Sequence, residues 1–171
     1  MLFGQKHSEG SLTFKEKKAK LREWINRRTE GEEGFTALHF AAFHGNLTIV
    51  RYLMDLGGDV HVKNHHNINL MHVSAQGDQA TSIVFLQRQG LDINSRDRKN
   101  STPLHWASYA GAETAIVYLL AFGALVNSRD AEGHTPLHLA VKSAEESKST
   151  RAVKHLLLRG SDRSIQVHSN N

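Results

Sequence analysis

A four-residue motif recurs along this chain at a fixed spacing of 33 residues, and this spacing constrains the fold more than any other feature of the sequence. The copies begin at positions 36, 69, 102 and 135, and they read Thr36-Ala-Leu-His39, Asn69-Leu-Met-His72, Thr102-Pro-Leu-His105 and Thr135-Pro-Leu-His138. We call each copy a box. A fixed period of this length is typical of a repeat protein, in which each repeat is one supersecondary unit that stacks on its neighbours.

Each box is followed by the pattern of a helix pair. Thr or Asn at the first position can cap a helix, and Pro103 and Pro136 fall at the first helical position, where the missing N–H removes no intrahelical bond. Small residues follow, and then a stripe of apolar residues with a period near 3.6 predicts a second helix. Each stripe ends at a glycine, which we expect in the left-handed conformation that closes a helix. These glycines are Gly57, Gly90, Gly123 and Gly160.

The box, the period and the closing glycines resemble the ankyrin repeat family. The resemblance implies an all-α solenoid of helix–turn–helix repeats joined by β-hairpin loops. It covers about residues 31–166 and gives repeats at 31–63, 64–96, 97–129 and 130–166, between an N-terminal segment of residues 1–30 and a tail of residues 167–171.

Three further departures from the family pattern occur along the repeats. The hairpin glycine of the family stands at Gly34 and Gly133 but is replaced by Asn67 and Asn100, and Asn is the next most tolerant residue for a positive φ. In the second repeat, the glycine that ends the first helix comes one place early, at Gly77. The fourth repeat has four extra residues within 143–150, which we expect to form a longer inter-helix loop.

The positive charge of the chain is confined to its start. Residues 1–30 contain eight Lys or Arg, Lys6 among them, and four Glu, whereas 13 basic and 13 acidic residues follow Glu30. A neutral body argues against a nucleic-acid groove, which needs clustered Lys and Arg. The pattern predicts a basic amphipathic helix from Leu12 to Arg28 with Phe14, Leu21, Trp24 and Ile25 on one side. We interpret it as a degenerate repeat that caps the stack, with contact to a membrane surface or a partner as the alternative.

Composition and motifs give no sign of catalysis in this chain. There is no cysteine, no apolar run approaching the ~18 residues of a membrane span and no apolar N-terminal stretch of signal-peptide type. Nucleophile-elbow, P-loop, dinucleotide-binding and zinc-protease motifs are also absent. We therefore expect a non-enzymatic chain without cofactor or metal, monomeric and cytoplasmic.

Twelve histidines raise the question of a metal site. Four belong to the boxes, where we expect them to bond backbone groups that tie neighbouring hairpins together. The adjacent pair His65-His66 and the nearby His61 lie at a predicted hairpin tip, with no Cys or carboxylate at ligand spacing. Contact with a partner is the favoured interpretation of this tip, and zinc binding is the alternative.

Partners of ankyrin proteins usually bind the hairpin tips and the exposed side of the first helices, and this resemblance implies a protein or extended peptide as the partner. Trp106 stands apart, because beside Tyr109 it could stack on an extended Pro-containing peptide. The alternative is that Trp106 fills the space between first helices. The candidate partner-binding residues are Phe35, Phe43, His44, His65, His66, Ile68, Gln76, Arg98, Lys99, Trp106, Tyr109, Glu132, His134 and Lys142.

Three features suggest a narrower resemblance: Thr102-Pro-Leu-His-Trp-Ala107, Gly34-Phe-Thr-Ala-Leu-His-Phe-Ala-Ala42 and the insertion at 142–150. Together they look like the cytosolic ankyrin region of Asp-His-His-Cys-type protein palmitoyltransferases, where the repeats recruit substrates. The chain also begins another hairpin after Gly160 without a closing helix. We therefore expect the N-terminal piece of a longer protein, with a naturally short chain as the alternative. A stand-alone ankyrin adaptor or inhibitor is the third hypothesis.

Overall fold

The computed structural model describes residues 13–165. Three features of the sequence interpretation, namely Lys6, the helix start at Leu12 and the tail 167–171, lie outside this range. Within it, nine helices follow one another: α1 (Phe14–Ile25), α2 (Ala37–Phe43), α3 (Leu47–Asp55), α4 (Leu70–Gln76), α5 (Ala80–Arg88), α6 (Pro103–Ala110), α7 (Glu113–Ala121), α8 (Pro136–Ser147) and α9 (Arg151–Leu158).

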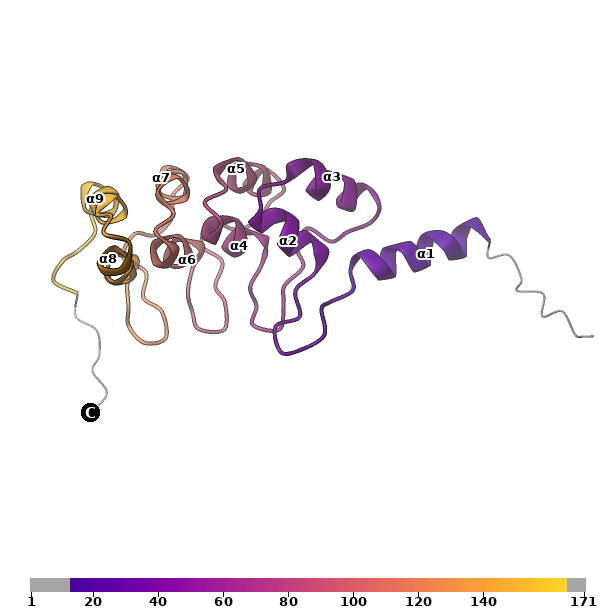
Figure 1. Ribbon diagram of the computed structural model, residues 1–171, viewed down its shortest axis with the longest axis horizontal. Coiled ribbons are helices and arrows are strands. Elements are labelled where there is room, and N and C mark those ends of the chain that lie inside the picture. The colour runs from indigo at the N-terminus through magenta and orange to yellow at the C-terminus, as the bar shows by residue number, and fades with distance from the viewer. Residues whose placement is uncertain (1–12, 166–171) are drawn as a thin grey trace, which may run out of the picture.

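Helices α2 to α9 form four stacked pairs in two layers (Figure 1). The first helices α2, α4, α6 and α8 pack side by side in one layer, and α5, α7 and α9 pack side by side in the other, with α3 at its end. The hairpin loops extend from the layer of first helices, and the core runs the length of the stack through box residues such as Leu38, Met71 and Leu104, which are fully buried. None of the described helices is long and apolar enough to span a bilayer. The predicted helix pairs are confirmed.

The box histidine connects its own helix to the next hairpin. Thr36 donates its backbone N–H to Nδ1 of His39 over 3.2 Å, and the Thr36 hydroxyl lies 3.0 Å from the same nitrogen. On the other side of the ring, Nε2 lies 3.1 Å from the carbonyl oxygen of Ile68. Because a carbonyl oxygen can only accept, Nε2 carries the proton and Nδ1 is the acceptor. The bonding pattern therefore requires a neutral imidazole in one tautomer.

The same bonds recur along the stack. Nε2 of His72 lies 3.2 Å from the carbonyl oxygen of Ser101, and Nε2 of His105 lies 3.1 Å from that of His134. His138 repeats the Nδ1 bonds to the backbone and hydroxyl of its own box threonine. The role predicted for the box histidines is thus confirmed for the first three.

Asn69 replaces threonine in the second box and makes a different set of bonds. Its Oδ1 accepts from the backbone N–H of Met71 and of His72, and its Nδ2 donates to Oγ of Ser95 over 3.0 Å. The carboxamide therefore caps α4 and also reaches the loop after α5. The first helix of this repeat is the most completely buried in the stack, since Leu70 to Ala75 are all buried.

Positive φ angles occur where the turns require them. Asn67 and Asn100 adopt φ values of 60° and 62°, as predicted for the two hairpins that lack glycine. At the end of α4, the left-handed position is occupied by Asp78, with φ of 57°, and Gly77 stays in the helical region at −78°. A Cβ on Gly77 would overlap the backbone carbonyl of Phe43, so this position needs a glycine because two first helices approach closely.

The insertion in the fourth repeat lengthens a helix and does not form the predicted loop. Helix α8 has 12 residues, against seven or eight in the other first helices, and it ends at Lys148, which is left-handed with φ of 58°. Ala144, Glu145 and Glu146 are good helix formers, and four residues correspond to about one turn. The four inserted residues therefore add about one turn to α8. Because they make nearly a whole turn, the chain leaves the helix in nearly the same direction as it would without them.

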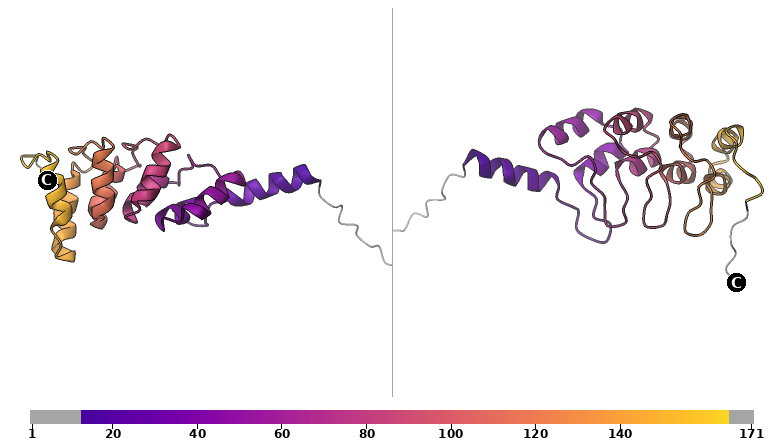
Figure 2. Two further views of the ribbon diagram at one scale, coloured as in Figure 1. Left: turned by 90° about the horizontal axis from the view of Figure 1, so that it is seen from above. Right: turned by 180° about the vertical axis from the view of Figure 1, so that it is seen from behind.

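Helix α1 does not cap the stack as predicted. It projects from the first repeat along the long axis, and no described helix packs extensively against it (Figures 1 and 2). Ile25 is its only buried residue. No described residue covers the stack end where a cap would lie, since Ile49 is 46% exposed where its counterpart one repeat later, Ser82, is fully buried. Lys17 and Lys18 interrupt the apolar side of α1, which explains why it cannot pack like a repeat helix.

Burial favours the neutral form of three box histidines. Desolvation lowers the pKa of His39, His72 and His105, and for His72 the value falls from 6.5 to about 4. The bond from Nε2 to the next hairpin opposes this shift in each case but is the smaller effect.

Acidification should therefore destabilise the stack. The unfolded chain takes up a proton on His72 near pH 6.5 and the folded chain only near pH 4, so the stability is full above pH 6.5 and is lost as the pH falls through this window. We expect a loss of about 3 kcal/mol from His72 alone, measured by urea denaturation across this pH range. The His72→Gln variant should be less stable at neutral pH and lose less on acidification. An equally steep pH dependence in that variant would contradict this assignment.

The left-handed residue that ends α8 offers a second test. Lys148→Gly should raise the free energy of unfolding by about 1 kcal/mol, because glycine adopts this conformation without steric strain. The matched change Lys154→Gly, in the middle of α9, should lower it by about 1 kcal/mol. If residues 143–150 instead formed a loop in which Lys148 is not left-handed, the glycine would not stabilise the chain. The unfolding midpoint of Lys148→Gly would then equal that of the wild type, which would contradict the prediction.

Candidate functional site

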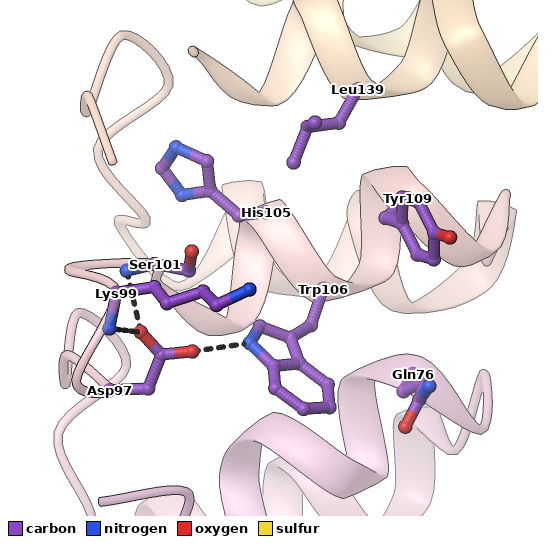
Figure 3. Close-up of a pocket in the computed structure, with 8 residues that line it drawn as sticks. All are labelled: Gln76, Asp97, Lys99, Ser101, His105, Trp106, Tyr109 and Leu139. Atoms are coloured by element: carbon purple, nitrogen blue, oxygen red, sulfur yellow. Dashed lines mark hydrogen bonds between the residues drawn. The ribbon is translucent and has the colours of Figure 1, made fainter. Parts of the chain in front are cut away.

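Two hollows adjoin on the hairpin side of the first helices. One, of about 270 Å³, lies between α4, α6 and α8 (Figure 3), and the other, of about 250 Å³, lies between α2 and α4. Gln76 of α4 lines both, so we treat them as one inner groove. The inner groove is lined by Phe35, His39, Phe40, Phe43, His44, Val73, Gln76, Asp97, Lys99, Ser101, His105, Trp106, Tyr109 and Leu139.

Trp106 is half-buried in the wall of the larger hollow. Its Nε1–H donates to Oδ2 of Asp97 over 3.0 Å (Figure 3). Its ring meets that of His72 edge-on at a centroid distance of 5.9 Å. Tyr109, on the same helix, is 60% exposed. Both interpretations of Trp106 thus have a structural basis, because its ring packs against the neighbouring repeat and also lines the hollow. A ring fixed in this way loses little freedom when a ligand stacks on it.

Asp97 organises the hairpin next to this hollow. Its Oδ1 accepts from the backbone N–H of Lys99 and of Ser101, over 2.9 and 2.8 Å, while Oδ2 is left to receive the indole (Figure 3). The residues at the same position of the adjacent repeats, Asn64 and Asp130, accept two equivalent backbone bonds in their hairpins. The side chain at this position therefore makes the same two backbone bonds in all three hairpins, and Asp97 bonds to Trp106 in addition.

The hairpin tips are joined to one another by backbone hydrogen bonds. Each bond connects residues 32 positions apart, so one tip is tied to the tip of the preceding repeat. The donor and acceptor pairs are His65 to Glu33, Arg98 to His66 and Ala131 to Lys99, with N···O distances of 3.1, 2.9 and 2.8 Å. These bonds fix the positions of the tips relative to the helices.

Half of the residues predicted to bind a partner line the inner groove. These are Phe35, Phe43, His44, Gln76, Lys99, Trp106 and Tyr109. Among the others, Arg98 and Glu132 are exposed at hairpin tips and Lys142 is exposed on α8. His134 is half-buried between Asp130 and Glu132, with Nδ1 3.5 Å from a carboxylate oxygen of each.

Ile68 is not a surface residue, and its prediction as a contact is wrong. Its side chain is only 5% exposed and belongs to the core. Its backbone N–H donates to Oδ1 of Asn64, and its carbonyl oxygen accepts a hydrogen bond from Nε2–H of His39. The bond to His39 ties the Ile68 backbone to the box of the preceding repeat, and the side chain lies in the core and not at the surface.

Part of the groove wall was not predicted from the sequence. Phe40, Val73, Trp106 and Leu139 each follow a box histidine, so they are 33 residues apart and line up along the groove. Of these four, only Trp106 is among the residues predicted to bind a partner, although Phe40 is 51% exposed and the periodicity relates the four positions. The groove is also lined by His39, Asp97, Ser101 and His105. Their hydrogen bonds to the backbone indicate a structural role, so the sequence does not show that they also form part of the groove surface.

The histidine pair at the second hairpin contacts the preceding tip. Nδ1 of His65 lies 3.1 Å from the carbonyl oxygen of Glu32, and Nε2 of His66 lies 3.9 Å from the carboxylate of Glu33. Over residues 13–165, no three or more His, Asp or Glu side chains converge in a way that could hold a metal ion. The pair therefore contributes to the tip surface and is engaged with the neighbouring hairpin.

Comparison with protein-family models identifies the repeats. A model of ankyrin repeats in three copies matches residues 70–168, and a single ankyrin repeat model matches residues 33–65. The chain is an ankyrin-repeat protein. The ankyrin resemblance and the all-α fold are thus confirmed, although no curated protein matches the chain. Ankyrin repeats generally mediate protein–protein interaction and are typically non-catalytic, and the inner groove lies on the ankyrin face formed by first helices and hairpins.

Changing Asp97 should separate its two roles. In Asp97→Asn the amide oxygen can keep the backbone bonds, as Asn64 does, but an amide N–H would face the indole N–H. We expect a loss of about 1 to 2 kcal/mol of unfolding free energy for Asp97→Asn, and more for Asp97→Ala. The fluorescence of Trp106, read in a Trp24→Phe background, should change in both variants. An unchanged spectrum would show that the indole bond does not form in solution.

Proposed function

We propose that the inner groove binds an extended segment of a partner protein. The observation that carries this proposal is the pair of adjoining hollows, each walled by aromatic side chains, with Gln76 between them. Apolar walls with a few polar groups are typical of binding sites. The Gln76 amide can both donate to and accept from a peptide backbone.

The spacing of the hollows favours a particular kind of segment. They occupy successive gaps between first helices, and packed helices lie about 8–10 Å apart. A polyproline II chain rises about 3.1 Å per residue with three residues per turn, so side chains three positions apart lie on one face at roughly 9 Å. We infer that the partner segment places apolar residues at positions i and i+3, one near Phe43 and one near Trp106.

Selection of binding peptides tests this proposal. Peptides selected from a displayed random library against the full chain should lose about 30-fold or more in affinity for Trp106→Ala, equivalent to about 2 kcal/mol, and a comparable amount for Phe43→Ala. Tyr118→Ala, on α7 in the other layer and 41% exposed, serves as the control and should bind normally. Isothermal titration calorimetry measures the affinities, and denaturation confirms that the variants fold. Equal binding by wild type and both groove variants would overturn the proposal.

Narrower roles rest on the sequence interpretation alone. The substrate-recruiting arm of a membrane palmitoyltransferase and a stand-alone adaptor or inhibitor both use an ankyrin surface, and the inner groove fits either role. The monomeric state and the cytoplasmic location likewise stay predictions.

A further inference from the structure

Helix α1 exposes large apolar side chains that the rest of the described chain does not cover. Phe14 is 85%, Trp24 73% and Leu21 40% exposed, and the helix projects beyond the stack (Figures 1 and 2). The free energy of exposing this surface is unfavourable, so a helix of this kind needs a surface to lie on.

The exposed apolar residues lie on one side of the helix. Leu21 follows Phe14 by 7 residues, which is close to two turns of 3.6 residues, and Trp24 follows Leu21 by three residues, so it lies next to Leu21 on the helix surface. Lys17 and Lys18 fall on the same side between them. Their aliphatic stems can lie along an apolar surface while the ammonium groups reach outward to anions.

The positive charge of α1 indicates which kind of surface the helix suits. From Thr13 to Arg28 the chain carries seven Lys or Arg and two Glu. One of the two, Glu16, is held in the capping box, where its carboxylate accepts from the Thr13 backbone N–H over 2.7 Å. Residues 29–165, by contrast, carry 13 basic and 14 acidic side chains. A cationic helix with Trp, Phe and Leu on one side matches an anionic lipid headgroup layer over an acyl interior.

The helix is fixed to the stack at its C-terminal end. Nδ2 of Asn26 donates to the carbonyl oxygen of Gly57 over 3.0 Å, and its Oδ1 accepts from the Asp59 backbone N–H over 2.9 Å. Asn94 makes the corresponding bonds to Gly123 and Leu125 within the stack. A surface that binds α1 would therefore hold the ankyrin stack beside it.

We propose that α1 binds the surface of an anionic lipid bilayer. It lies in the interface with Phe14, Leu21 and Trp24 toward the acyl chains and its lysines among the headgroups. This role is separate from the inner groove and does not depend on it.

The two tryptophans of the chain allow a direct test. In the Trp106→Phe variant of the full chain, Trp24 is the sole indole. Vesicles of phosphatidylcholine containing phosphatidylserine should sediment the protein and shift Trp24 emission to the blue, and vesicles of phosphatidylcholine alone should do neither. Raising the salt concentration should release the protein, since Debye screening weakens the attraction.

Charge reversal provides the matched comparison. The triple variant Lys17→Glu, Lys18→Glu, Lys20→Glu should lose about 100-fold or more in partitioning, because each basic side chain near such a surface contributes about fivefold. The control reverses three exposed charges at the other end of the stack, Lys154, Arg159 and Arg163, and should bind as the wild type does. Phe14→Ala with Leu21→Ala should abolish the blue shift.

Three outcomes would overturn the proposal: no preference for phosphatidylserine at low salt, equal losses in both triple variants, or binding to an acidic polypeptide without binding to vesicles. Circular dichroism confirms that each variant is folded. Because peptide binding in the inner groove is measured without lipid, failure here leaves the proposed groove function untouched.

Discussion

The bond between a neutral box imidazole and the carbonyl of the next hairpin is the interaction on which the stack depends. It joins residues 29 positions apart, so it connects consecutive repeats and also orients each hairpin against its helix. The ring can make both bonds only in one tautomer, and burial lowers the pKa that would otherwise allow a second proton. The apolar core supplies most of the driving force for folding, but it does not by itself set the register of the hairpins.

The inner groove follows from this register. Since the first three box histidines bond to the next hairpin and the fourth sits in the same box, the residue after the histidine projects from the first helix at the same place in every repeat. Phe40, Val73, Trp106 and Leu139 occupy that place, and their differences in size and shape give the groove its two hollows. The periodic backbone provides a regular wall, and the identity of the side chains in it determines which segment can bind.

Much of the fold could be predicted from local signals in the sequence. A fixed period, proline at the first helical position and asparagine at positive φ each report on a few residues, and the structure confirms them. Where the outcome depended on tertiary packing, prediction failed. Residues 143–150 are polar enough for a loop but continue α8, because one added turn preserves the path of the chain. Helix α1 has an apolar side but does not pack, and Ile68 turns inward because its backbone is bonded on both sides. For the site, Phe43, Trp106 and Tyr109 could be predicted from the sequence. Phe40 and Leu139 were missed although the period relates them to Trp106, and His39 and Asp97 were missed because their hydrogen bonds to the backbone gave no sign that they reach the groove.

The repeats are not equally buried along the stack, and this difference sets the order in which they unfold. In the part of the chain that the structure describes, Ile49 is 46% exposed on the first repeat and Val141 45% exposed on the last, whereas α4 in the second repeat is the most fully buried first helix. Repeats that contact only their neighbours behave as a one-dimensional chain, so among these four repeats we expect local unfolding to begin where burial is least and to reach the second repeat last. The repeat whose box departs furthest from the common pattern is thus the one that opens last. Gln76 lies in it at the centre of the groove, and a segment bound there would span the repeats on either side and slow the unzipping of both.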